Sequence, residues 1–198
     1  TDALYTLKGY YTGGYSGSIP TNVNLESSLG NLDKLENLDY YLGLYDTWSS
    51  YKPESEGVLI AYASIHGNTA AVAEKLGEML REKGVAKVVI SDLARADMAE
   101  VIEDAFRYDR MILAAASYDS GVFPCMQDFL HHLQSKAYQK RKVGIVENGS
   151  WAPSAGRVMR GILDTMKELE IVEPMVTIRS TMKDSDLEKL NELADAMK

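Results

Sequence analysis

The chain has 198 residues, of which 45% are hydrophobic and 25% are charged, as in ordinary soluble globular proteins. Its net charge of −8 and its lack of a basic run argue against nucleic acid as a partner. No apolar run reaches the ~18 residues of a membrane span, and a single cysteine, Cys125, excludes an internal disulfide framework, so we expect a cytoplasmic protein.

Residues 1–51 are predicted to form an N-terminal extension. Residues 1–31 are rich in Tyr, Gly, Ser and Asn and show no long periodic pattern. Residues 32–48 carry apolar side chains at roughly helical spacing, which predicts a helix that docks on the main domain or on a second subunit. These positions are Leu32, Leu35, Leu38, Leu42, Tyr45 and Trp48. Pro53 marks a linker, and residues 52–198 form the predicted second domain.

From residue 58 onwards, apolar runs alternate with helical patterns. Strands are predicted at residues 58–64, 87–93, 111–117, 142–148 and 171–178. Helices are predicted at residues 69–83, 97–108, 124–138, 155–169 and 185–198. This alternation is typical of a parallel sheet that helices cover on both faces, and it predicts an α/β fold with three α/β/α layers.

The segment SIHGNT, residues 64–69, joins the first predicted strand to the first helix of this domain. In an open parallel sheet, ligands bind beyond the carboxyl ends of the strands, where the strand order reverses. The N–H groups at a helix start favour an anion, and Gly67 allows the backbone to approach it. The segment contains no Lys or Arg, which suits a monophosphate. The alternative is a purely structural turn with Asn68 or Thr69 as the N-cap.

Two further loops are predicted at the same edge of the sheet. SYDSGVFP, residues 117–124, follows the third strand, and ENGSWAPSAG, residues 147–156, follows the fourth. Each contains glycine, serine and an aromatic residue, so Tyr118 and Trp151 could cover the faces of a flat heteroaromatic ring. The three loops together predict a site for such a ring on a phosphate tail.

The segments WSSYKPE, GVLIAYASIHGNT, SYDSGVFP and GSWAPSAG resemble, in this order, the FMN-binding flavodoxin-like domain of flavodiiron proteins. The resemblance covers roughly residues 40–198 and implies a five-stranded parallel sheet of order 2-1-3-4-5. It implies bound FMN, with residues 64–69 at the phosphate, residues 117–122 near the N5 edge of the ring and residues 148–155 beside it. The chain departs from the family at Asp119, where Asn is expected, and at Pro153 and Ser154, where Gly is usual.

The resemblance also implies an electron-transfer role. The expected partners are a rubredoxin-type donor or flavin reductase and a di-iron oxidase domain, and a homodimer is left open. The di-iron domain of the family has several His ligands, whereas this chain has only His66, His131 and His132, so no metal site is expected. The cofactor-binding residues implied are Ser64, Ile65, His66, Gly67, Asn68, Thr69, Ser117, Tyr118, Asp119, Ser120, Gly121, Asn148, Gly149, Ser150, Trp151, Ala152 and Pro153.

Asp119 near the ring and Glu147 at its rim are expected to lower the potential of the bound flavin. No self-contained catalytic site is recognised, and Cys125 is interpreted as a small core residue. An FMN-dependent NAD(P)H quinone or nitro reductase, and an FMN-free interaction module, stay open as alternatives. A response-regulator receiver is rejected, since it needs an acidic pair beside the first strand and a lysine where Arg179 stands.

Overall fold

We describe a computed structural model of the chain over residues 38–198. The predicted extension before residue 38, including Leu32 and Leu35, lies outside the described residues. The helix predicted at residues 32–48 is found as α3, Leu38–Ser49. A compact unit spans Asp46–Lys198, and it holds the sheet, the helices that cover it and all three loops of the predicted site. The boundary expected between residues 51 and 52 stays a prediction.

The sheet of this unit contains seven strands. Its main path has the order β2-β1-β3-β5-β6, and all pairs along it are parallel. The strands of the path are β2 (Val88–Asp92), β1 (Ser55–Ala63), β3 (Tyr108–Tyr118), β5 (Lys142–Asn148) and β6 (Glu170–Ile171). β4 (Gly121–Val122) pairs antiparallel with β3, and β7 (Val176–Ile178) pairs parallel with β5. The prediction of a parallel α/β sheet is confirmed, but the expected count of five strands is wrong.

Two physical reasons explain the difference in strand count. The predicted fifth strand at residues 171–178 is split into β6 and β7, because Pro174 has no N–H group to donate to a strand ladder. The added strand β4 arises where the chain turns back on β3 at Asp119 and Ser120, with φ angles of 46° and 60°. Left-handed values at both central positions fit a two-residue hairpin turn.

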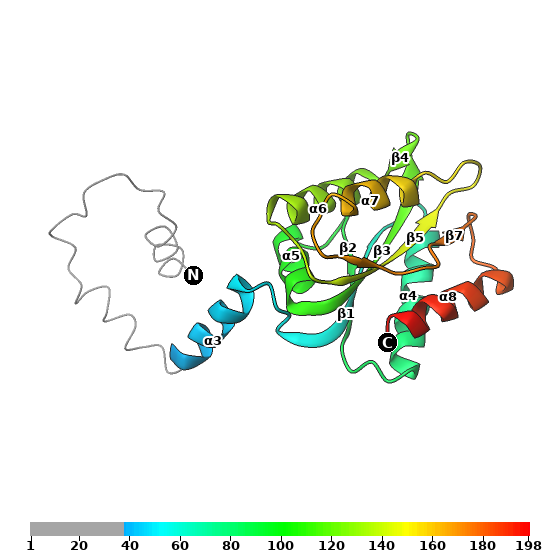
Figure 1. Ribbon diagram of the computed structural model, residues 1–198. Coiled ribbons are helices and arrows are strands. Elements are labelled where there is room, and N and C mark those ends of the chain that lie inside the picture. The colour runs from blue at the N-terminus through cyan, green and yellow to red at the C-terminus, as the bar shows by residue number, and fades with distance from the viewer. Residues whose placement is uncertain (1–37) are drawn as a thin grey trace. The chain divides into compact units, whose positions relative to one another are not determined.

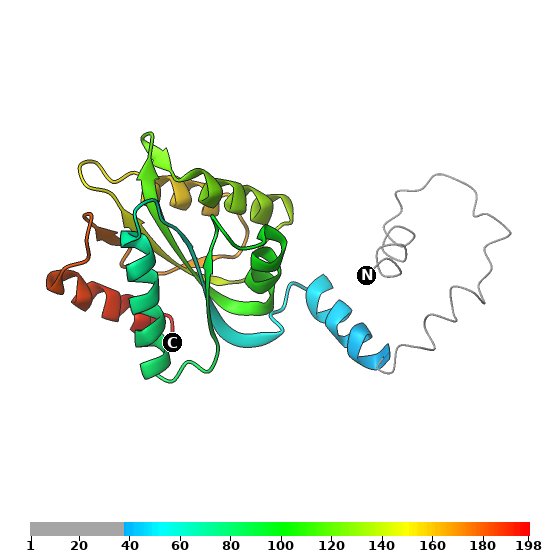
Figure 2. The same cartoon turned by 180° about the vertical axis from the view of Figure 1, so that it is seen from behind.

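Helices cover both faces of the sheet (Figure 1). One core cluster lies between the sheet and α5 (Met98–Arg107), α6 (Pro124–Ser135) and α7 (Ala155–Leu163). A second cluster lies between the sheet and α4 (Asn68–Glu82) and α8 (Asp184–Ala196), which lie side by side on the other face (Figure 2). Residues 58–61 of β1 are fully buried, as expected for a strand with both faces covered. The three-layer α/β/α architecture is therefore confirmed.

Some helices and strands begin or end at residues other than those predicted. The helices α6 and α7 end at Ser135 and Leu163, before the predicted residues 138 and 169, and β3 begins at Tyr108 rather than at residue 111. Just after α6, Ala137 has φ of 57°, a left-handed value that a helix cannot continue through. Tyr138 is nonetheless almost fully buried, and its ring meets that of Phe106 edge to face at a centroid distance of 5.3 Å.

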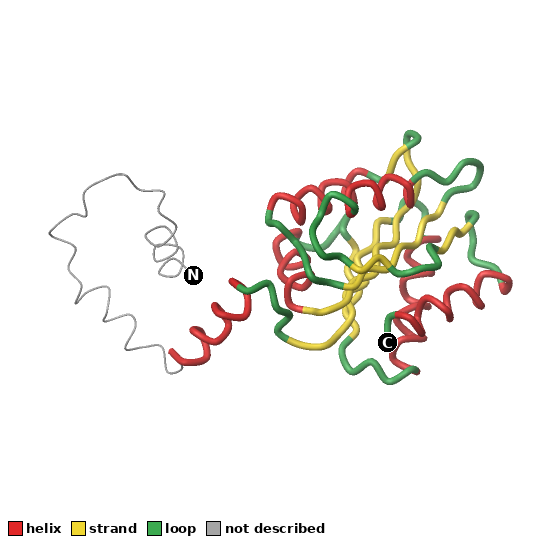
Figure 3. The backbone as a smooth tube through the Cα atoms, in the orientation of Figure 1, coloured by secondary structure: helices red, strands yellow, loops and turns green. Residues whose placement is uncertain are grey.

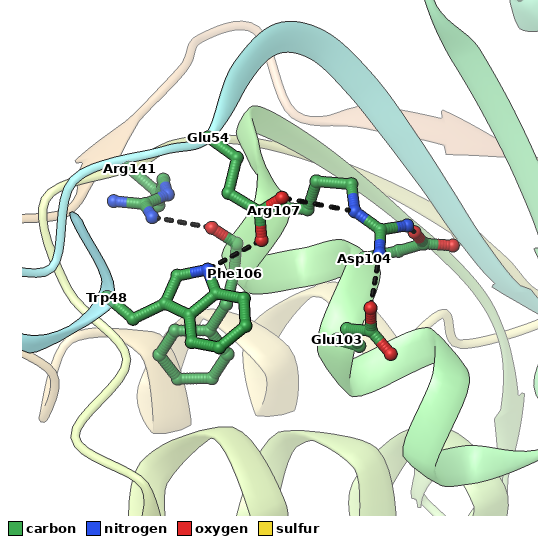
Figure 4. A network of polar contacts seen from close by, with 7 residues as sticks. All are labelled: Trp48, Glu54, Glu103, Asp104, Phe106, Arg107 and Arg141. Carbon is green, nitrogen blue, oxygen red and sulfur yellow. Dashed lines mark hydrogen bonds and ion pairs between the residues drawn. The ribbon is translucent and has the colours of Figure 1, made fainter. Parts of the chain in front are cut away.

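The amino ends of β1, β3 and β5 are tied together by polar contacts (Figure 4). The Arg141 guanidinium, buried before β5, donates to the carbonyl oxygens of Phe106 at 2.8 Å, Tyr108 at 2.9 Å and Tyr51 at 2.6 Å. Burial lowers the pKa of Arg141. Trp48 Nε1 donates to Glu54 at 2.6 Å. The linker predicted at residues 49–57 is therefore fixed, through Tyr51 and Glu54, to the edge of the sheet opposite the predicted cofactor loops, and its last three residues belong to β1.

Candidate functional site

The three loops of the predicted site leave neighbouring strands at one edge of the sheet (Figure 3). Ala63, the last residue of β1, pairs with Ala115 of β3, and Ala116 pairs with Asn148, the last residue of β5. β1 is followed along the chain by β2 on one side and then by β3 on the other. The loops after β1 and β3 therefore lie at the point where the strand order reverses, the usual position for a ligand in an open sheet.

The loop at residues 64–69 leads from β1 into α4. Gly67 is the N-cap, with φ of 85°, a left-handed conformation that glycine adopts without steric cost. Ser64 Oγ accepts a hydrogen bond from the Gly67 N–H at 3.1 Å and so closes the turn. No side chain caps α4, so the alternative in which Asn68 or Thr69 is the cap is wrong. The positive end of the helix is left open for an anion.

The side chains of this loop differ in their exposure. Ile65 is 40% exposed and His66 is also exposed, whereas Thr69 is only 2% exposed. The Thr69 hydroxyl is therefore enclosed by protein, and the accessible polar groups of the loop are those of Ser64, His66 and Asn68.

The loop after β3 is the tight hairpin to β4. Tyr118 pairs with Gly121 across it, and Asp119 and Ser120 form the exposed turn. The Tyr118 side chain is 46% exposed, and its ring meets that of Phe123 edge to face at a centroid distance of 5.7 Å. This contact holds the tyrosine at the rim of the hairpin, while nearly half of the residue stays exposed to solvent.

The loop after β5 is held at its first residues by the segment that follows β7. Asn148, which is buried, donates from Nδ2 to the Ser180 carbonyl at 2.8 Å and accepts from the Ser180 N–H at 3.1 Å. The Ser150 and Ser180 hydroxyls lie 2.6 Å apart. Beyond these anchors, the indole of Trp151 is 93% exposed. A large apolar side chain in this state has surface to bury when a flat ligand binds.

The far end of the same loop is fixed where α7 begins. Ser117 Oγ accepts from the N–H groups of Ser154 at 2.9 Å and Ala155 at 3.1 Å. Glu147 Oε2 accepts from the Gly156 N–H at 2.8 Å, and its Oε1 accepts from the Thr177 hydroxyl at 2.8 Å. These bonds satisfy the start of α7 from within the protein.

The expectation that Glu147 lies at the rim of the site is therefore wrong. Glu147 is only 6% exposed. Both of its carboxylate oxygens accept hydrogen bonds, one from the Gly156 N–H and the other from the Thr177 hydroxyl. The carboxylate lies at the positive end of α7, and that dipole offsets part of its charge. A Cβ atom at Gly156 would lie 3.0 Å from this carboxylate, so the close approach depends on glycine there.

Two residues that hold the site in place were not predicted from the sequence. Ser180 and Thr177 bind residues of the loop after β5, and neither stands in one of the three quoted loops. A usable signal existed, because Thr177 lies in the last strand and Ser180 follows that strand by two residues, and in a parallel sheet this end lies at the same edge as the other loops.

The remaining candidates fit structural roles. Cys125 is half-buried at the start of α6 and packs on the core, as interpreted, and burial raises the pKa of its thiol. His131 and His132 are exposed on α6, and His132 lies 3.7 Å from Asp128. Tyr62, near the end of β1, also has a raised pKa, first because of burial and then because of Asp92.

Two open hollows lie away from the three loops. One, of about 620 Å³, is lined by α5 and α6 and includes Met98 and Ile102. The other, of about 410 Å³, is lined by charged residues at the amino ends of β3 and β5. Within residues 38–198, no group of three His, Cys, Asp or Glu side chains is arranged to hold a metal ion, and no helix is both long and apolar enough to cross a bilayer.

The layers, the strand order and the loop positions define a flavodoxin-like α/β protein. The family model for the flavodoxin domain matches residues 59–160, more than half of the chain, and the chain belongs to this family.

Known proteins with similar structures include rubredoxin oxygen:oxidoreductase from Desulfovibrio gigas, with a TM-score of 0.74, 18% identity and coverage of 80% of this chain and 39% of that one. Flavodoxin 1 from Bacillus cereus has a TM-score of 0.62, 20% identity and coverage of 72% of this chain and 97% of that one. An uncharacterized protein of Methanocaldococcus jannaschii is 24% identical over 159 residues, which cover 78% of this chain and 39% of the relative.

The TM-scores of the two solved structures show a shared fold. The chain spans about two-fifths of the length of the Methanocaldococcus relative and of the Desulfovibrio enzyme, and nearly all of the flavodoxin. The resemblance to a flavodoxin-like domain is thereby confirmed.

Proposed function

We propose that the chain binds FMN at the edge formed by the loops after β1, β3 and β5, and that it carries electrons. One observation carries the proposal. The uncapped start of α4 lies at the same edge as Ile65, Tyr118 and Trp151, three exposed large apolar side chains, each from a different loop. An open anion site beside three outward-facing apolar side chains suits a flat ring on a phosphate tail.

A second helix, α7, also begins at this edge of the sheet, and its start does not suit an anion. The first N–H groups of α7 are already bound by Ser117 and by the Glu147 carboxylate. An incoming anion would meet a negative charge there, whereas α4 presents no side-chain cap. The residues therefore fit one anionic group at α4 and an uncharged ring towards the other two loops, as FMN requires.

In this arrangement the phosphate is bound by the Ser64 hydroxyl, by the Asn68 carboxamide and by N–H groups at the start of α4. Gly67 permits the close approach of the backbone. His66 is a further donor at the exposed side of the loop. No Lys or Arg belongs to residues 64–69, so the dipole of α4 supplies the positive potential.

Tyr118 and Trp151 are proposed to cover the ring, and backbone groups of residues 119–121 and 148–153 to bind its polar edge. Burial of the ring between aromatic side chains excludes water from it and adds about 0.5–1.5 kcal/mol for each aromatic pair. When bound, the isoalloxazine ring takes up and releases electrons reversibly, and the protein sets its orientation and potential.

The redox partners that we propose are those implied by the resemblance to flavodiiron proteins. Electrons would come from a rubredoxin-type donor or a flavin reductase and pass singly to an oxidase centre, a di-iron one in flavodiiron proteins. The name of the Desulfovibrio enzyme, rubredoxin oxygen:oxidoreductase, supports this direction of transfer.

A direct assay separates this role from that of an NAD(P)H-dependent reductase. The FMN-loaded protein should be reduced rapidly by NADPH only when a flavin reductase is added, and should then reduce a one-electron acceptor. Steady oxidation of NADPH by the loaded protein alone would contradict the carrier role and favour the quinone or nitro reductase.

A further inference from the structure

The start of α7 is held by side chains from two other elements rather than by its own N-cap. Ser154 occupies the N-cap position but makes no capping bond with its side chain. Instead, Ser117 of β3 accepts from the N–H groups of Ser154 and Ala155, and Glu147 of β5 accepts from that of Gly156. Three consecutive N–H groups are thus satisfied by two strands of the sheet.

The same contacts determine where the loop at residues 148–155 can lie. Ser154 Oγ donates to the Gly121 carbonyl at 2.8 Å and ties the loop to the hairpin after β3. At the other end, Asn148 is bound to Ser180. The loop is therefore anchored at both ends, and Trp151 between the anchors stays exposed.

The loop at residues 64–69 contrasts with this arrangement. Its turn is closed by the bond from the Gly67 N–H to Ser64, and no side chain caps the helix that follows. The loop at residues 148–155, proposed to lie beside the ring, is hence fixed by hydrogen bonds within the protein. The loop at residues 64–69, proposed to bind the phosphate, leads into a helix whose first N–H groups have no side-chain cap.

We propose that Ser117 and Glu147 are positioning residues for the flavin ring. By capping α7, they hold the loop at residues 148–155 in place before the cofactor binds. The Ser117 oxygen accepts two N–H bonds, so its hydroxyl hydrogen is still available to one further acceptor. The inference rests on the proposed function, since it assigns the ring to this loop.

Ser117→Ala tests the inference through two readouts. In the cofactor-free protein, the Ser154 and Ala155 amides should lose protection against hydrogen exchange. The dissociation constants of riboflavin and FMN should both rise by the same factor, about fivefold, which corresponds to the loss of one helix cap. Ser117→Thr, which keeps the hydroxyl, should restore both. Ser135→Ala serves as the matched control, because it removes a serine hydroxyl that binds a carbonyl at the end of α6.

Glu147→Gln separates the position of this side chain from its charge. The glutamine carbonyl can still accept from Gly156, and its amide can donate to Thr177, so Gly156 should stay protected and riboflavin should bind within about twofold of the wild type. Loss of Gly156 protection together with unchanged riboflavin binding would show that this cap does not position the ring.

The outcomes distinguish the inference from the proposed function. If the wild-type protein binds neither flavin, both fall. If the wild type binds both flavins and Ser117→Ala binds them equally well, or keeps its amide protection, only the positioning role falls. A loss confined to FMN would assign Ser117 to the phosphate and would also overturn the inference.

Discussion

The carboxamide of Asn148 and the backbone of Ser180 form a closed pair of hydrogen bonds. Nδ2 of Asn148 donates to the Ser180 carbonyl at 2.8 Å, and the Ser180 N–H donates to Oδ1 at 3.1 Å. Ser180 has φ of 64°, a left-handed conformation that is unfavourable for a residue with a Cβ atom. The pair links the loop after β5 to the segment after β7 and holds Ser180 in this conformation.

Replacing Asn148 with alanine should therefore destabilise the fold. Two hydrogen bonds to the half-buried backbone of Ser180 would be lost, at a net cost of about 0.5–1.5 kcal/mol each. Urea unfolding, followed by far-UV circular dichroism, measures the change. Asn191→Ala, on the exposed face of α8, should stay within about 0.5 kcal/mol of the wild type. Equal stability of the two variants would show that the Asn148 contact contributes little.

Gly67→Val should weaken FMN more than riboflavin. A β-branched residue disfavours the left-handed conformation and blocks close approach of the phosphate to the backbone. Gly84, after the other end of α4, has φ of 88°, and a Cβ atom there would also meet open space. Gly84→Val is therefore a control with the same backbone strain, and it should lower stability without changing the ratio of the two affinities.

Thr69→Ala should lower stability by about 1 kcal/mol and leave the ratio of the FMN and riboflavin affinities unchanged, because its hydroxyl is enclosed by protein. Calorimetric titration with both flavins measures these effects. An equal loss of FMN and riboflavin in Gly67→Val would mean that the phosphate is not bound by residues 64–69.

Flavin binding should quench the fluorescence of Trp151. Its side chain is 93% exposed at the proposed ring site, whereas Trp48 binds Glu54 at the opposite edge of the sheet. Trp151→Phe should lose most of the quenching, and Trp48→Phe should keep it. Quenching that persists in Trp151→Phe would place the ring elsewhere.

Asp119→Asn should raise the midpoint potential of the bound flavin. The carboxylate of Asp119 is exposed in the hairpin turn, and removing its negative charge favours electron uptake by roughly tens of millivolts. Asparagine also tolerates the φ of 46°, so the turn should be preserved. A redox titration at low ionic strength measures the shift, which should shrink in added salt. An unchanged potential under both conditions would remove Asp119 from the electrostatics of the site.

The alternation of apolar runs and helical patterns was sufficient to predict the layers of the fold. Runs such as residues 58–61 are apolar without interruption because both of their faces are buried. The strand count was wrong because single residues decided it. Pro174 interrupts the predicted strand at residues 171–178, and the turn at Asp119 and Ser120 lacks the Asn-Gly or Asp-Gly sequence that marks a hairpin.

The order of strands and helices along the chain was sufficient to predict that the three loops share one edge of the sheet. It did not predict the contacts that the side chains of these loops make. Glu147 was expected at the rim of the flavin ring, yet its carboxylate accepts from the start of α7, where Gly156 leaves room for it. The partners that bury it, Gly156 and Thr177, are nine and thirty residues away along the chain. Such contacts depend on tertiary packing, which a local pattern does not encode.

Co-elution of FMN with the protein is the most direct test of the central claim. Purified chain is incubated with excess FMN, separated by gel filtration and examined by visible absorption, with riboflavin in a parallel run. We expect a yellow protein peak with close to one FMN per chain and less riboflavin retained, because riboflavin lacks the phosphate that the start of α4 binds. A protein peak without flavin absorbance after this treatment would show that the chain does not bind FMN.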